Sequence, residues 1–127
     1  MKKKGFSQKH KPGFPNSDAL YSWYEKQFKL QNGCCYYCET SIDLINALIA
    51  KDLLKTRAVR GDGMRGPSLE IDKLINELGY SPSNCVLACY YCNNDKSYIF
   101  PPDQYKRYLG PSRSKLFSDL ALELNKR

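Results

Sequence analysis

The chain has 127 residues, of which 42% are hydrophobic, 26% charged and 13% aromatic. This length fits a single domain with at most one flexible end, and the composition is that of a globular protein rather than a disordered, collagen-like or coiled-coil chain. No apolar run approaches the roughly 20 residues that a membrane-spanning helix needs. The lysines near the start are not followed by the apolar stretch of a signal peptide, so we expect a cytoplasmic protein with no membrane partner.

Positive charge is concentrated at the start of the chain. Twenty Lys and Arg against thirteen Asp and Glu give a net charge of +7. The first eleven residues contain no acid and five lysines, namely Lys2, Lys3, Lys4, Lys9 and Lys11. We predict a flexible basic arm over residues 1–16 and one domain over residues 17–127. Such an arm suits contact with nucleic-acid phosphates, and it is equally typical of a solvated terminus that aids solubility.

Two helices are predicted in the first half of the chain. The residues Asn-Ser-Asp at 16–18 offer an N-cap for a helix over 19–31, where apolar residues recur at helical spacing. A capping pattern, Thr-Ser-Ile-Asp at 40–43, opens a second helix that extends to about Lys55. The glycine-rich segment 56–67 contains Arg57, Arg60 and Arg65, and we interpret it as a loop that is either a solvated connection or a phosphate contact.

Strands and shorter helices are predicted in the second half. Alternating apolar and acidic residues indicate a strand over 69–72, turn residues follow at 79–83, and a second strand covers 84–88. Residues 93–97 are expected to start a short helix, and Pro101 and Pro102 to open another that extends through Leu109. Ser112 is expected to cap a final helix with its apolar side chains on one face. The predicted class is α+β.

Four of the six cysteines form two C-x2-C pairs with identical Tyr-Tyr spacers. Cys35 pairs with Cys38 and Cys89 with Cys92, a spacing that lets two thiolates of one tight turn reach the same ion. Four protein ligands leave no position open for substrate, so we predict a structural zinc that ties distant segments together. Reduced core cysteines or a redox pair are the alternative. The tyrosine spacers are expected to pack around the zinc, although stacking on nucleic-acid bases is also open.

The remaining cysteines have no predicted role. Cys34 could replace Cys35 after a shift of one residue, but the matching spacers favour Cys35. Cys85 lies in a predicted apolar strand, where a free thiol behaves as a small hydrophobic side chain.

The order strand, turn, strand, C-x2-C and short helix over residues 35–97 resembles the HNH endonuclease family. The residues that carry the resemblance are Asp72 and Lys73 at the end of the first strand, Asn84 at the start of the second, Asn93 directly after Cys92, and Lys96. This family usually has His where Lys73 stands, and some phage and bacterial members have Arg. The resemblance implies a ββα-metal core (the His-Me finger, treble-clef-like arrangement) that is braced by a structural zinc and surrounded by helices.

The resemblance also implies a catalytic site and a substrate. Asp72 and Asn93 are expected to hold a catalytic Mg²⁺ or Mn²⁺ ion, and Asn84 to orient the base. Lys73 stands in the place of the family's general base, and a lysine with an ordinary pKa near 10.4 is a poor base at neutral pH. The only histidine, His10, is a weak candidate for that role. Taken singly, these residues are equally typical of a strand end, a turn and a helix cap.

The expected function is hydrolysis of DNA phosphodiester bonds by a metal-dependent HNH-type endonuclease, in a phage, mobile-element or defence setting. The alternatives are a catalytically impaired zinc module of the same fold that binds nucleic acid, and a small protein-interaction factor. The residues expected to contact nucleic acid are the five arm lysines, Arg57, Arg60, Arg65 and Lys96.

Overall fold

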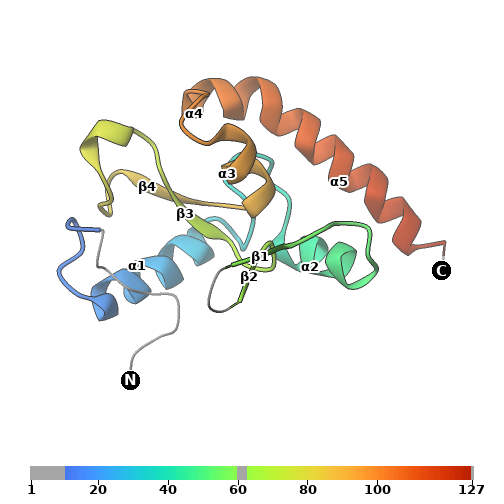
Figure 1. Cartoon of the computed structure of the whole chain (residues 1–127), viewed down its shortest axis with the longest axis horizontal. Coiled ribbons are helices and arrows are strands. Elements are labelled where there is room, and N and C mark those ends of the chain that lie inside the picture. The colour runs from blue at the N-terminus through green and yellow to red at the C-terminus, as the bar shows by residue number, and fades with distance from the viewer. Residues whose placement is uncertain (1–10, 60–62, 127) are drawn as a thin grey trace.

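The computed structural model describes residues 11–59 and 63–126, and its architecture is α+β. An antiparallel hairpin of β3 (Glu70–Lys73) and β4 (Cys85–Ala88) lies near the centre, with α1 (Ser17–Leu30) below it and α3 (Tyr90–Lys96) above it in Figure 1. Helix α1 packs against β4, and α3 packs against β3. The predicted α+β class is confirmed.

The first two helices begin at the caps that the sequence predicts. The Asn16 side chain accepts a hydrogen bond from the backbone N–H of Ala19 at 2.8 Å, and Ser41 caps α2 (Ile42–Ala50) in the same way. Helix α2 is shorter than predicted. Asp52 adopts a left-handed conformation (φ 58°), and Leu53 donates to the carbonyl of Leu48, which closes the helix several residues before Lys55.

The central hairpin has a regular register. Glu70 faces Ala88, Asp72 faces Val86 and Lys73 faces Cys85, so the predicted strands are present with β3 shifted by one residue. The loop between them contains the short helix η1 (Asn76–Leu78). The segment predicted as a plain loop contains a second, smaller hairpin, β1 (Arg57–Ala58) with β2 (Met64–Arg65). Two-residue strands carry too little hydrophobic alternation to be predicted from the sequence.

The helices at the end of the chain are continuous. Helix α4 (Pro102–Gln104) runs through a π-helical turn, η2 (Tyr105–Leu109), into α5 (Gly110–Leu124), so the predicted interruption before Ser112 is wrong. Pro111 lies in the first turn of α5, and the wider π-helical turn before it accommodates the missing N–H. A Cβ on Gly110 would lie 2.2 Å from the carbonyl oxygen of Tyr37, so only glycine allows this close approach.

The core gathers around the hairpin and the cysteine pairs. Several of its fully buried side chains come from helices α1, α2 and α5 and from strand β4. They include Leu20, Ile45, Leu48, Leu87 and Phe117. In the apolar face predicted for the last helix Phe117 is buried, whereas Leu116 is exposed. Among the described residues, no helix is long and apolar enough to cross a membrane.

The chain enters the folded body before α1. Phe14 is buried and its ring lies 5.5 Å from that of Trp23, while the N–H of Gly13 donates to the carbonyl oxygen of Tyr80. The packed part of the chain therefore begins a few residues before the predicted boundary at residue 16.

Candidate metal centre and the polar residues around it

Four cysteines from two distant segments converge on one point. The sulfur atoms of Cys35, Cys38, Cys89 and Cys92 all lie within 4.8 Å of one another, and all four residues are buried. A tetrahedral zinc with Zn–S bonds of about 2.3 Å requires S–S separations of about 3.8 Å. The Cys38 and Cys89 sulfurs are 4.0 Å apart. The cluster is therefore positioned to hold a metal ion such as zinc.

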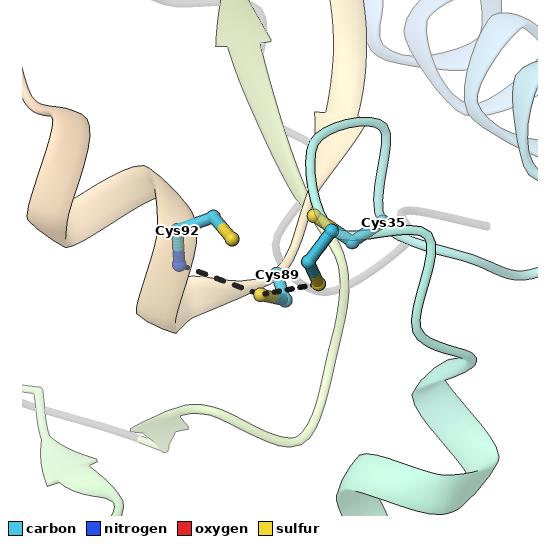
Figure 2. A group of neighbouring side chains, drawn as sticks. Cys35, Cys89 and Cys92 are labelled. Atoms are coloured by element: carbon cyan, nitrogen blue, oxygen red, sulfur yellow. Dashed lines mark hydrogen bonds between the residues drawn. The ribbon is translucent and has the colours of Figure 1, made fainter. Parts of the chain in front are cut away.

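Backbone geometry presents the sulfurs to the centre. Figure 2 shows Cys35 on the loop that follows α1, facing Cys89 and Cys92 at the beginning of α3. Cys89 is the N-cap of α3, and its sulfur accepts a hydrogen bond from the N–H of Cys92 at 3.4 Å. The sulfur of Cys35 accepts one from the N–H of Tyr37 at 3.3 Å. Helix α3 begins earlier than predicted because this cap lies at Cys89.

Without a cation, the four thiols compete for protons. Hydrogen bonds from Cys38, Cys89 and Cys92 lower the pKa of Cys35, while hydrogen bonds to Cys35 and Cys38 raise the pKa of Cys92. Four thiolates within such a short distance repel one another in a buried site. A divalent metal ion supplies the positive charge that allows all four to ionise together.

The other two cysteines lie outside this cluster. Cys34 is half-buried and Cys85 is buried in β4, and neither belongs to the cluster found among the described residues. The tyrosine spacers pack around the centre, as predicted. The Tyr37 ring is buried edge-on against Tyr36 at 5.1 Å, and Tyr91 packs against Phe117 at 5.8 Å.

Asp72 lies in a buried polar network rather than at a solvated strand end. Its Oδ2 accepts a hydrogen bond from the hydroxyl of Tyr37, and its Oδ1 lies 3.2 Å from the Nζ of Lys96. The side chains of Asp72 and Lys96 are only 8% and 3% exposed. Burial raises the pKa of Asp72, and the Tyr37 hydroxyl and the Lys96 ammonium oppose only part of that effect. The network joins the first cysteine pair, β3 and α3.

Asn93 contacts Glu70 instead of Asp72. Its Nδ2 donates to Oε1 of Glu70 at 3.0 Å, and Arg65 binds the same carboxylate through two hydrogen bonds, at 2.9 and 2.5 Å. The Arg65 guanidinium also lies over the Tyr90 ring, 4.6 Å from its centre. Sequence reasoning had not assigned Glu70, although its position two residues before Asp72 places both on one face of β3.

Asn84 and Lys73 have different surroundings. The Asn84 side chain is buried, accepts from the N–H of Ile75, and donates to the carbonyls of Ile75 and Gly79, so it braces the loop between β3 and β4. The Nζ of Lys73 lies 4.9 Å from the centre of the Tyr80 ring. Since side chains alternate along a strand, Lys73 and Asp72 project from opposite sides of β3.

The structure separates the predicted nucleic-acid contacts into three groups. Lys2, Lys3, Lys4, Lys9 and Arg60 lie outside the described residues, as does His10. Arg57 is exposed in the small hairpin, Lys11 is half-buried, and the half-buried Arg65 is bound to Glu70. Lys96 is buried against Asp72, so its ammonium group is not exposed for contact with nucleic acid.

Comparisons with known proteins identify no relative. No family model matches the chain, and no significant match was found among curated proteins or solved structures.

Proposed function

We propose that this chain is an HNH-type endonuclease that hydrolyses DNA phosphodiester bonds, with β3, β4 and α3 as its ββα-metal core. The observation that carries the proposal is the joint placement of these elements. An antiparallel hairpin leads directly into a short helix, and the four-cysteine cluster ties that helix to the loop before α2. The residues of the HNH pattern all lie on this one unit.

Asn84 and the four-cysteine cluster have supporting roles. Asn84 uses all of its hydrogen-bonding groups within the hairpin loop, so it fixes the conformation of the chain that follows Lys73. The zinc cluster supports the opposite end of the unit. Its four protein ligands are typical of a structural site, where the metal stabilises the fold and takes no part in the reaction.

A divalent catalytic ion has oxygen ligands of suitable type at the junction of β3 and α3. The Oδ1 of Asn93 accepts no hydrogen bond from the described residues, and a carboxylate such as Asp72 offers lone pairs beyond the two in use. An ion held there by Asp72 and Asn93 would stabilise the negative charge on a phosphodiester during cleavage. Lys96 competes with it, because its ammonium already occupies one side of the Asp72 carboxylate.

A non-catalytic DNA-binding module of the same fold is the second candidate. Two observations favour it. Lys96 neutralises Asp72 in a buried ion pair, and Lys73 lies on the opposite side of β3 from that carboxylate. A domain that binds the DNA backbone without cutting it needs neither a divalent ion nor a general base.

Plasmid cleavage by zinc-loaded full-length protein separates the two candidates. We expect nicking or cleavage with Mg²⁺ or Mn²⁺, its loss on chelation of that ion, and its loss in Asp72→Asn with zinc content retained. Asn93→Ala is expected to weaken the ion and reduce cleavage less severely. Lys73→His should maintain or raise activity if Lys73 occupies the position of the base.

The outcome that favours the second candidate is equally specific. The second candidate is favoured if wild type and Lys73→His both bind duplex DNA, but neither protein cuts DNA or RNA with Mg²⁺, Mn²⁺ or Ni²⁺. Circular dichroism and metal analysis of each variant serve as controls, because Asp72 belongs to a buried network whose disruption can unfold the domain.

A further inference from the structure

Two lysines that are far apart in the sequence lie around one tyrosine ring. The Nζ of Lys11 is 5.0 Å from the centre of the Tyr80 ring, and the Nζ of Lys73 is 4.9 Å from the same point. Both distances are within the range of a cation–π contact. Tyr80 therefore holds the ammonium groups of two separate segments at the end of the central hairpin.

Cys85 lies on the same side of the hairpin as Lys73. It is the cross-strand neighbour of Lys73, so the two side chains project from the same side of the hairpin. Burial and the charge of Asp72 raise the pKa of the Cys85 thiol, whereas a backbone hydrogen bond with Ser81 and the charges of Lys73 and Lys11 lower it. Each ammonium is thus close enough to influence the same sulfur atom.

The position of Lys11 is determined by the backbone rather than by the lysine itself. The N–H of Gly13 donates to the carbonyl oxygen of Tyr80 at 3.0 Å, and a Cβ on Gly13 would lie 2.1 Å from that oxygen. Phe14, the next residue, is buried against Trp23. Figure 1 shows this first described segment beside the loop between β3 and β4. Glycine is the only residue that allows this close approach, so the segment is anchored where Lys11 meets Tyr80.

Both lysines bring an ammonium group to the Tyr80 ring. No carboxylate among the described residues lies within ion-pair distance of Lys73, and Asp72 points to the other side of β3, where Lys96 neutralises it. A phosphate group that reaches both ammonium groups would be held by charges from two separate segments of the chain. Phosphate is the anion that lysine commonly binds as a point charge.

We propose that Lys11 and Lys73, arranged around Tyr80, form a binding site for one phosphate group of the DNA backbone. The choice of DNA rests on the proposed function, whereas the phosphate site rests on the geometry alone. The site gives Lys73 a role in binding substrate, and it connects the basic start of the chain to the hairpin that carries the HNH-like residues.

Salt-dependent binding of the full-length, zinc-loaded protein to a short fluorescent DNA duplex tests the site. Without divalent cations, log affinity falls with log salt by about 0.9 for each phosphate neutralised. A double variant, Lys11→Gln with Lys73→Gln, is expected to reduce this slope by about 0.9, which corresponds to about eightfold weaker binding near 0.1 M salt. The matched control is Lys51→Gln, an exposed lysine at the end of α2, which should leave the slope unchanged.

Two results would overturn the shared site. The first is that the double variant binds DNA like the Lys51→Gln control, which would mean that Lys11 and Lys73 hold no phosphate. The other is a slope reduced by about twice the expected amount, with the two single variants strictly additive, which indicates separate contacts to separate phosphates.

Variants that preserve charge test the arrangement itself. Gly13→Ala should weaken binding about as much as Lys11→Gln, because the new Cβ displaces the segment while the net charge stays at +7. Tyr80→Phe should bind like wild type because it retains the ring, whereas Tyr80→Leu should bind more weakly. If Gly13→Ala and Tyr80→Leu are folded and bind like wild type, the arrangement around Tyr80 is irrelevant and the proposal fails.

A measurement without DNA separates this proposal from the proposed function. Inorganic pyrophosphate is titrated into the wild-type protein, and the side-chain NMR signals of Lys11, Lys73 and Lys51 are followed. Shifts at Lys11 and Lys73 but not at Lys51 support the phosphate site even if DNA is neither bound nor cut. Equal shifts at all three lysines, or none, overturn it even if the protein proves to be a nuclease.

Discussion

Replacing Lys96 by Met should destabilise the domain by several kcal/mol, although Lys96 lies in the last turn of a short helix, α3. The substitution retains an unbranched side chain only one atom shorter and removes its charge. Asp72 then remains with the Tyr37 hydroxyl as its only partner in this network. A carboxylate buried without its cation is among the most unfavourable arrangements in a protein interior.

The magnitude follows from the burial of both partners. With side-chain exposures of 8% for Asp72 and 3% for Lys96, solvent cannot replace the lost partner. Breaking a buried ion pair from one side costs about 3–5 kcal/mol, a large part of the roughly 5–15 kcal/mol that typically stabilises a domain. Asp72 can escape part of this cost by binding a proton, since burial already raises its pKa. The loss should therefore be larger at pH 8 than at pH 5.

Urea unfolding followed by circular dichroism measures the effect, with zinc content checked in each variant. The matched control is Lys115→Met, which removes a lysine from the exposed Lys115–Asp119 pair, where the two side chains are 76% and 58% exposed. That variant should change the free energy of unfolding by less than about 0.5 kcal/mol. Adding Asp72→Asn to Lys96→Met should restore most of the stability, because the asparagine still accepts from Tyr37. A loss below about 1 kcal/mol for Lys96→Met would show that the pair is not effectively buried.

Three further predictions concern the metal, the hairpin loop and pH. Cys92→Ser should lose the bound metal and much of the folded structure, whereas Cys34→Ser should keep one metal per chain, as measured by metal analysis and thermal unfolding. Asn84→Ala should reduce the free energy of unfolding by about 2 kcal/mol or more, because it leaves backbone groups of the loop without hydrogen-bond partners. The control is Asn76→Ala, at an exposed residue of the same loop, which should have little effect on urea unfolding. Burial raises the pKa of the Tyr24 hydroxyl to about 12. The stability that the protonated Tyr24 contributes is therefore complete below pH 10 and is lost as the pH rises towards 12. Tyrosinate absorbance of wild type, compared with that of Tyr24→Phe, measures this late titration.

Local patterns predicted the elements that depend on neighbouring residues. Asn16 and Ser41 cap their helices as expected, because a cap needs only a side-chain oxygen and the first turn that follows it. The cysteine cluster was also predictable, since each C-x2-C pair forms a two-ligand turn by itself and two such turns complete one tetrahedral set. Where an element ended was predicted less well. Asp52 closes α2 early in a left-handed conformation that the sequence did not indicate.

The α+β class, the starts of α1 and α2 and the cluster of four cysteines could be predicted from the sequence alone. Tertiary structure alone decided the partners of the charged residues. Lys96 looked like a surface lysine, and Asp72 like a strand end or a metal ligand, until the packing of α3 on β3 placed them 3.2 Å apart in the interior. Lys11 and Lys73 are likewise joined only because Gly13 bonds to the hairpin loop. The physical reason is that a charged side chain carries no sequence signal of its partner, since the partner is chosen by contacts between segments far apart in the chain.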